Sequence, residues 1–202
     1  MSIRTIMSLL LTLAATSMAF AAGDPVAGQA RTAICGACHG PDGNSPVPNF
    51  PKLAGQGARY LNKQLHDIKS GQRAVPEMTG MLANLSDQDL QDIAAWYATQ
   101  KPSIGAADAI LVAAGEALFR GGNLAKGLPA CIGCHAPDGT GIALAGFPHL
   151  GGQHAQYVAK QLTDFREGVR GNDGDSQVMR SIAAKLSNKE IAALSAYIQG
   201  LH

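Results

Sequence analysis

Apolar residues recur at helical spacing in several stretches of the chain. In the range 60–69, Leu61, Leu65 and Ile68 share one face, and Gly71 follows as a stop signal. Two later stretches carry the same kind of stripe, formed by Leu90, Ile93 and Tyr97 and by Ile191, Leu194 and Ile198. No run of residues alternates between apolar and polar as a half-buried strand would. The pattern therefore predicts an all-α fold.

Helix-start signals precede these stretches. A serine with an acidic residue three positions later, the form of a helix-opening cap, occurs at Ser86/Asp89 and at Ser187/Glu190, and the second pair is a full capping box. Asp24-Pro25 predicts a capped helix that runs towards Cys35. Asp108 begins the corresponding segment of the second half, which extends through Phe119 and ends at Gly121-Gly122.

The chain contains an internal duplication. The motif Cys-Gly-Ala-Cys-His-Gly-Pro-Asp-Gly at 35–43 recurs as Cys-Ile-Gly-Cys-His-Ala-Pro-Asp-Gly at 131–139, which is 96 positions later. Phe50-Pro51-x-Leu53 recurs after 97 positions, and the same offset relates further residues to later copies, namely Tyr60, Lys63, Gln64, Leu65, Asp67, Gly71 and Arg73. Leu85-Ser86 recurs at an offset of 101. Because there are only two copies, we expect two tandem homologous domains rather than a solenoid.

The first residues have the composition of a secretory signal peptide. Arg4 supplies the positive charge, residues 6–13 the apolar segment and Ala19-Phe20-Ala21 the cleavage site. A retained membrane anchor is the alternative, but hydroxyl residues interrupt the apolar run. We therefore expect an exported chain that begins at Ala22 after cleavage.

The duplication and the leader together predict three segments. Residues 1–21 form the signal peptide, 22–102 the N-terminal domain and 103–202 the C-terminal domain. The boundary lies near Lys101-Pro102-Ser103-Ile104-Gly105, where proline and glycine interrupt the helical pattern.

Composition excludes one class of function and raises a question about the cores. Among 202 residues, 16 Lys and Arg stand against 15 Asp and Glu, so the chain lacks the basic surplus of a nucleic-acid-binding protein. Aromatic residues make up only 5% of the chain. Something other than Phe and Trp must supply part of the apolar bulk of two small domains.

Cys-x-x-Cys-His is the attachment signature of c-type haem, and it occurs at Cys35/Cys38/His39 and at Cys131/Cys134/His135. A redox Cys-x-x-Cys would lie in a βαβ unit, and a zinc site would need two cysteine pairs about 15 to 20 residues apart. A disulfide framework would not place histidine after both pairs. The sequence therefore predicts two covalent haems, whose apolar bulk also accounts for the shortage of aromatic residues.

His39 and His135 are then the expected proximal iron ligands. A ligating imidazole needs a partner for its second ring nitrogen, and the carbonyls of Pro41 and Pro137 are candidates because each lies two residues on. Alternatively, these prolines only shape the loop.

The sixth ligand is selected by the repeat. Met78, Met81 and His66 are candidates in the first half. Met78 corresponds to Met179, whereas Met81 corresponds to Ile182 and His66 to Thr163, neither of which binds iron. We expect Met78 and Met179 to be the ligands and Met81 to fill the core, with open or bis-histidine iron as the alternatives.

The remaining repeated or unusual polar residues have plainer expected roles. We expect His149 and His154 to be surface or pocket-rim residues and His202 to be solvated. Lys63-Gln64 and Lys160-Gln161 are expected on solvated helix faces and Tyr60 and Tyr157 in the cores. Arg73 and Arg170, which precede the methionines in each copy, are candidates to reach haem propionates.

Taken together, the chain resembles the dihaem cytochromes c4 of bacteria. The resemblance rests on both haem motifs, the range 50–56 (Phe-Pro-Lys-Leu-Ala-Gly-Gln), the range 77–81 (Glu-Met-Thr-Gly-Met) and the range 162–168 (Leu-Thr-Asp-Phe-Arg-Glu-Gly). It implies two class I cytochrome c domains related by a pseudo-twofold axis, with haems close to the domain interface and His/Met ligation at both irons. It also implies a periplasmic, often loosely membrane-associated protein that passes electrons towards haem-copper terminal oxidases.

These features predict an electron carrier and not an enzyme, because two axial ligands leave iron no vacancy for a substrate. The donor would be a quinol-oxidising complex or a small cytochrome. One alternative is a dihaem peroxidase with one open haem, and another is the haem subunit of a dehydrogenase complex.

Overall fold

The computed structural model describes residues 23–202, and its regular elements are all helical. The N-terminal half holds α1 (Pro25–Arg31), α2 (Gly36–His39), α3 (Ala58–Lys69), the 3-10 helix η1 (Pro76–Met78) and α4 (Asp87–Thr99). The C-terminal half holds α5 (Val112–Gly121), η2 (Leu124–Lys126), α6 (Ile132–His135), η3 (Ala143–Ala145), α7 (Ala155–Arg166), α8 (Val178–Ala183) and α9 (Asn188–Gly200). Within these residues, β-structure is limited to two isolated bridges, so the all-α prediction is confirmed.

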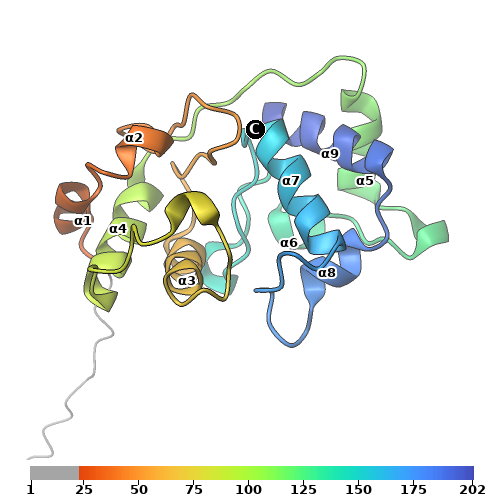
Figure 1. Ribbon diagram of the computed structural model, residues 1–202. Coiled ribbons are helices and arrows are strands. Elements are labelled where there is room, and N and C mark those ends of the chain that lie inside the picture. The colour runs from red at the N-terminus through yellow and green to blue at the C-terminus, as the bar shows by residue number, and fades with distance from the viewer. Residues whose placement is uncertain (1–22) are drawn as a thin grey trace, which may run out of the picture.

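The two halves lie side by side and are joined by an extended segment (Figure 1). This segment, residues 100–107, carries no regular structure and coincides with the predicted boundary. The expected signal peptide, residues 1–21, lies outside the described residues. Within residues 23–202, no helix combines the length and the apolar character needed to cross a membrane.

Both predicted serine caps are present. The Ser86 side chain accepts from the Asp89 backbone N–H, and the Asp89 carboxylate accepts in return from the Ser86 backbone N–H. Ser187 and Glu190 form the same reciprocal pair at the start of α9. The first pair is therefore also a capping box, which the aspartate at the third position did not lead us to expect.

The first helix of each half differs from its predicted bounds. Asp24 caps α1 as expected, but the helix ends at Arg31 and not near Cys35. In the second half α5 begins only at Val112, because the Asp108 side chain and carbonyl accept the N–H groups of Ile110, Leu111 and Val112 and hold a turn first.

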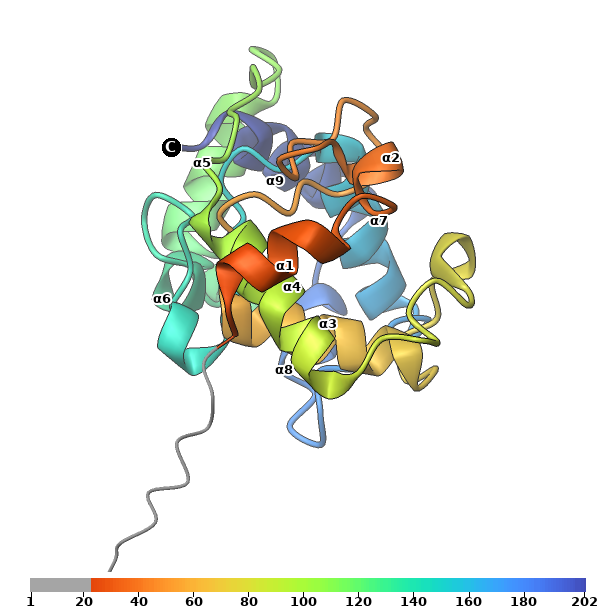
Figure 2. The ribbon, with the colours of Figure 1, turned by 90° about the vertical axis from the view of Figure 1, so that its left-hand side faces the viewer.

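The first and last helices of each half cross at a glycine. Figure 2 shows α1 lying across α4, and α5 packs against α9 in the same way. A Cβ atom on Gly28 would lie 2.0 Å from the Asp92 carbonyl oxygen, and one on Gly115 would lie 2.1 Å from that of Ala193. Only a residue without a side chain allows these backbones to approach so closely.

Each half has its own apolar core, and each core includes the first cysteine of a Cys-x-x-Cys-His motif. The N-terminal core is built mainly from α3 and α4, with Leu61, Leu65, Leu90, Ile93 and Tyr97 among its buried members. The C-terminal core is built mainly from α5, α7 and α9, with Phe119, Val158, Ile191, Leu194 and Ile198. Cys35 and Cys131 pack against these cores.

Candidate haem sites

The two Cys-x-x-Cys-His motifs form one-turn helices that end at a buried histidine. Cys35 precedes α2 and His39 ends it, and Cys131 and His135 stand in the same relation to α6. After each histidine the chain turns through positive φ, at Gly40 (80°) and at Ala136 (62°). Because of this turn, the loop that follows each histidine runs away from the histidine.

Each histidine ring is oriented by a backbone carbonyl. Nδ1 of His39 lies 2.9 Å from the Pro51 carbonyl oxygen, and Nδ1 of His135 lies 3.1 Å from that of Pro148. The prediction that Pro41 and Pro137 supply the acceptor carbonyls is wrong, because the chain turns away directly after each histidine. Pro51 is brought to the ring by Leu53, whose backbone N–H donates to the Gly43 carbonyl (2.7 Å).

These contacts prepare both imidazoles to bind a metal. A carbonyl accepts a proton from Nδ1, which leaves Nε2 as the nitrogen with a lone pair. Burial lowers the pKa of His39 and of His135, against the opposing effect of the carbonyl bond, so both rings are held neutral. Neutral imidazole is the form that ligates iron.

The four cysteines are free thiols, which is not what a disulfide framework requires. Burial raises the pKa of Cys35 and raises that of Cys131 to about 11. Cys38 is exposed and Cys134 half-buried. Each motif therefore presents two protonated or accessible thiols and one metal-binding nitrogen on a single helical turn, the donor set of a covalently attached haem.

Met78 and Met179 occupy corresponding places in different local structures. Met78 ends η1, is half-buried and packs against the core that contains Cys35. Met179 is half-buried in α8, a helix that the first half replaces by η1 and a series of turns. Met81 was expected in the core, but it is 41% exposed, because it lies in the turn that follows η1.

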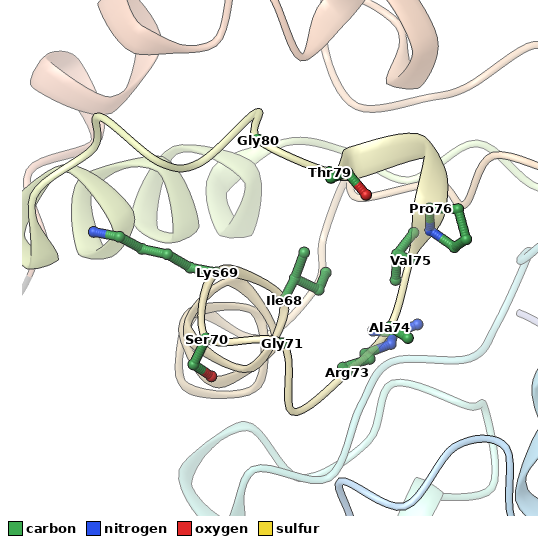
Figure 3. Close-up of a pocket in the computed structure, with 10 residues that line it drawn as sticks. All are labelled: Ile68, Lys69, Ser70, Gly71, Arg73, Ala74, Val75, Pro76, Thr79 and Gly80. Atoms are coloured by element: carbon green, nitrogen blue, oxygen red, sulfur yellow. The ribbon is translucent and has the colours of Figure 1, made fainter.

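Each half has a cavity lined by residues that neighbour its methionine in the sequence. The first, of about 470 Å³, lies between the end of α3 and the segment that carries Met78 (Figure 3). Ile68 and Gly71 line one side of it, and Val75, Pro76 and Thr79 line the other. The second, of about 410 Å³, lies between Phe165–Gly168 and the residues that flank Met179. Neither cavity is lined by a cysteine, a proximal histidine or one of these methionines.

A buried donor near the first site has no hydrogen-bond partner among residues 23–202. Trp96 packs against the same core as Cys35 and Met78, and its Nε1–H is buried without an acceptor. Indole nitrogen is a donor only, and a buried donor without a partner costs free energy. A haem carries carboxylates that accept hydrogen bonds, so this orphaned donor fits the group that the cysteines and histidine imply.

Two arginines, Arg170 buried and Arg73 half-buried, bridge the halves beside these sites. Arg73 Nη2 donates to the Tyr157 hydroxyl and to Gln161 Oε1, both at 2.9 Å. Arg170 Nη2 donates to the Tyr60 hydroxyl (3.1 Å) and to Gln64 Oε1 (2.9 Å), which repeats the arrangement with the halves exchanged. We expected the Lys-Gln pairs to lie on solvated helix faces. Gln64 and Gln161 instead lie at the interface between the halves.

Arg73, Arg170 and their hydrogen-bond partners carry more positive than negative charge. Among the described residues, neither guanidinium forms a salt bridge, and both point at hydroxyl and amide oxygens. Holding these two positive charges in the interface without a negative partner costs free energy. An anion bound beside them would therefore be stabilised.

A second interface element lies close to the proximal histidines. Gln56 Nε2 donates to the His149 carbonyl (3.1 Å), and Gln56 Oε1 accepts from the His149 backbone N–H (2.9 Å). His149 and His154, expected to be surface or pocket-rim residues, therefore lie at the interface between the halves. His154 Nε2 lies 2.8 Å from the Ser45 carbonyl oxygen of the other half, whereas His202 is exposed as expected.

Sequence reasoning missed Gln56 and its counterpart Gln153, although a signal was present. Both glutamines follow a glycine, and they stand 97 positions apart, the offset that relates Pro51 to Pro148. The recurrence of this glutamine at the same offset as Pro51 and Pro148 could therefore have identified both residues from the sequence.

Comparison with known proteins gives consistent relatives over nearly the whole chain. The family model described as cytochrome c matches residues 26–101 and again 112–202. The chain is 73% identical over 199 residues to cytochrome c4 of Pseudomonas aeruginosa, covering 98% of this chain and 99% of that one. It is similar to the crystal structure of reduced recombinant cytochrome c4 from Pseudomonas stutzeri, with a TM-score of 0.89, 67% identity and coverage of 90% and 100%. A more distant relative, 38% identical over 81% of this chain and 76% of its own length, is the thiosulfate dehydrogenase electron acceptor of Stutzerimonas stutzeri.

Proposed function

Since this chain belongs to the cytochrome c4 family of dihaem electron-transfer proteins, we propose that it carries electrons in the periplasm towards a terminal haem-copper oxidase, through two haems with His/Met ligation. The observation that carries the proposal is that each half contains both a buried, carbonyl-bonded histidine in a Cys-x-x-Cys-His motif and a half-buried methionine.

The roles of individual residues follow from their chemistry. Cys35, Cys38, Cys131 and Cys134 form the thioether bonds that attach the two haems. His39 and His135 are the proximal ligands, and the carbonyl bond at each Nδ1 directs Nε2 to the iron. Met78 and Met179 are the opposite ligands.

Bound haem would supply reversible one-electron exchange, and histidine and methionine together would leave its iron no position for a substrate. The chain's contribution is to exclude water and hold each imidazole in one orientation and one tautomer. Met ligation raises the reduction potential relative to bis-histidine ligation, which suits a late step in a respiratory chain. Placing two such sites in one chain lets an electron enter through one domain and leave through the other.

Arg73 and Arg170 have a place in this proposal. Arg170 is buried and Arg73 half-buried at the interface, and among residues 23–202 neither guanidinium has a carboxylate in salt-bridge contact. We propose that haem propionates supply the missing negative charge, the contact for which the sequence made these residues candidates.

Export and membrane contact belong to the same proposal. The leader at 1–21 would send the chain to the periplasm, where covalent haem attachment takes place, and peripheral association with the membrane would bring it to its partners. The donor would be a quinol-oxidising complex or a small cytochrome.

An oxidised and reduced optical spectrum, scaled to haem content, tests the ligation. Two haems per chain, with the sulfur-to-iron charge-transfer band at full intensity for both, would support closed His/Met sites. A half-strength band with a high-spin component would contradict them and favour the peroxidase alternative. In that case cyanide or carbon monoxide would bind one haem without denaturant.

The second candidate is an electron acceptor for a dehydrogenase. The relative named as a thiosulfate dehydrogenase electron acceptor favours it, because it covers 81% of this chain. Stopped-flow mixing separates the two candidates. Rapid oxidation of the reduced protein by oxidase-containing membranes, with slow reduction by thiosulfate dehydrogenase and thiosulfate, supports the first. The opposite order of rates supports the second.

A further inference from the structure

The hydrogen bond of each proximal histidine continues through a peptide group into the other half of the molecule. His39 Nδ1 bonds the carbonyl oxygen of Pro51, and the N–H of that same peptide unit belongs to Lys52. The Lys52 N–H donates to Gln153 Oε1, in the C-terminal half, at 2.9 Å. An uninterrupted path therefore runs from the His39 ring through one peptide to Gln153.

The second site repeats this path with the halves exchanged. His135 Nδ1 bonds the carbonyl oxygen of Pro148 at 3.1 Å, and the N–H of that peptide belongs to His149. The His149 N–H donates to Gln56 Oε1, in the N-terminal half, at 2.9 Å. Each proximal histidine thus ends its path at a glutamine of the opposite half.

Both glutamine side chains are held in one orientation. Gln153 Nε2 donates to the Lys52 carbonyl (2.9 Å), and Gln56 Nε2 donates to the His149 carbonyl (3.1 Å). Since an N–H needs an acceptor and a carbonyl needs a donor, the paired contacts assign the amide oxygen to the backbone N–H in both cases. Each glutamine is only 7% exposed, so water does not compete for these contacts.

Hydrogen bonds in such a series strengthen one another. When the peptide N–H is engaged by an amide oxygen, electron density shifts to the carbonyl oxygen of the same peptide, and that oxygen becomes a better acceptor for the histidine Nδ1–H. A stronger bond at Nδ1 makes the imidazole a more electron-rich ligand, which favours the oxidised iron.

We propose that Gln153 and Gln56 are positioning residues that each lower the reduction potential of the haem in the opposite domain, through the Pro51–Lys52 and Pro148–His149 peptides. The inference rests on the proposed roles of His39 and His135 as ligands. Contacts across the interface between the halves would then help to set the reduction potentials of both haems.

The test is a pair of single variants of the full-length holoprotein, Gln153→Met and Gln56→Met. Methionine approximates the length of glutamine and removes both hydrogen bonds to the opposite half, together with the one that each amide oxygen accepts from the next residue of its own chain segment. Reduction potentials are measured by spectroelectrochemistry, and each haem is assigned by the NMR signals of its own methyl groups. The Nδ1–H resonance of each proximal histidine in the reduced protein gives a second readout.

The expected result is a crossed pattern. Gln153→Met should favour reduction of the N-terminal haem by about threefold, which is about 28 mV for one electron, and leave the C-terminal haem unchanged. Gln56→Met should do the reverse. In each variant the Nδ1–H resonance of the histidine in the opposite domain should move upfield as its hydrogen bond weakens.

Arg59→Lys is the matched control. Arg59 Nη1 also bonds a backbone carbonyl across the interface, that of Leu144 at 2.6 Å, but this peptide touches neither proximal histidine. The charge is retained, so neither potential should shift. A shift of equal size in this control would overturn the proposal, since any loosened interface would then have the same effect.

Other outcomes also decide the matter. A shift confined to the variant's own domain, equal shifts of both haems, or no shift would each contradict the proposed path. The charge-transfer band recorded on the same samples keeps the two proposals apart. An intact band without the crossed shift rejects the glutamine path alone, whereas absence of the band in the unmodified protein rejects His/Met ligation.

Discussion

Arg73 of the N-terminal half donates a hydrogen bond to the hydroxyl of Tyr157 in the C-terminal half, over 2.9 Å. The donor is charged and lies in the interface between the halves, where a hydrogen bond is worth more than in water. The Tyr60 hydroxyl accepts from Arg170 in the same manner at 3.1 Å. Both tyrosines thus join the halves, in addition to the packing role expected from sequence.

Tyr157→Phe should therefore destabilise the docked pair of domains by about 2 kcal/mol, because it leaves a charged donor without one of its acceptors. Tyr60→Phe should cost a similar amount, since its contact is equivalent. Chemical denaturation of the holoprotein measures both. Two variants indistinguishable from the unmodified protein would mean that water replaces the hydroxyl at no cost.

Met78→Leu should lower the reduction potential of the N-terminal haem alone, by on the order of 0.1 V within the roughly 0.8 V range that axial ligands span. Loss of the thioether removes the ligand that favours the reduced iron. Potentiometry with domain-assigned haems gives the result. Met81→Leu is the control, because Met81 is exposed in the neighbouring turn and should alter neither haem. Equal shifts in both haems would refute the ligand assignment.

Gly28→Ala and Gly115→Ala should each destabilise one domain by about 3 kcal/mol or more, because the new methyl group would meet a backbone carbonyl of the crossing helix. Gly121→Ala lies in the same helix as Gly115, but its Cβ meets nothing within 4 Å. That control should change stability little or raise it by up to about 1 kcal/mol through helix propensity. Thermal unfolding of the three variants separates close contact from helix propensity.

The fall in the free energy of unfolding at acidic pH should depend on Glu190. A hydrogen bond from Lys126, followed by those from Ser187, lowers the pKa of Glu190 from 4.5 to about 2. Because the folded-state pKa is the lower one, the stabilisation is complete above pH 4.5 and is lost as pH falls towards 2. The side chain is partly solvated, so we expect about 1 kcal/mol or less.

Glu190→Gln should accordingly flatten the fall in stability over that pH range, as followed by urea unfolding at several pH values. Lys126→Met should give a smaller effect of the same kind, because the contacts with Ser187 remain. A fall at acidic pH that is unchanged in both variants would contradict the assigned cause.

Much of the architecture could be predicted from local signals. Ser86 and Ser187 mark the starts of α4 and α9, because their capping side chains act within four residues. Cys35, His39 and their counterparts could be recognised because covalent attachment demands a fixed spacing. The duplication then singled out Met78 and Met179 for the remaining coordination positions, and their role as ligands stays a prediction.

Contacts made by the backbone or across the interface could not be predicted in this way. The acceptor for His39 is the carbonyl of Pro51, and a backbone carbonyl leaves no mark on the sequence. Gln64 and Gln161 lie on polar helix faces, and periodicity does not distinguish a face that meets water from one that meets another domain. Met81 was misplaced because a methionine at helical spacing looks the same in a turn as in a core.

The reciprocal contacts at the interface have a bearing on ancestry. Arg73 reaches Tyr157 while Arg170 reaches Tyr60, and Gln56 and Gln153 exchange partners in the same way. Residue i touches residue j and the copy of j touches the copy of i, which is the pattern of an isologous contact between two identical subunits. A single ancestral half would have carried on one surface everything needed to pair with a copy of itself. Fusion of two such copies would turn a concentration-dependent homodimer into a permanent pair and would let the copies diverge. The two repeats do differ where Lys52 aligns with His149.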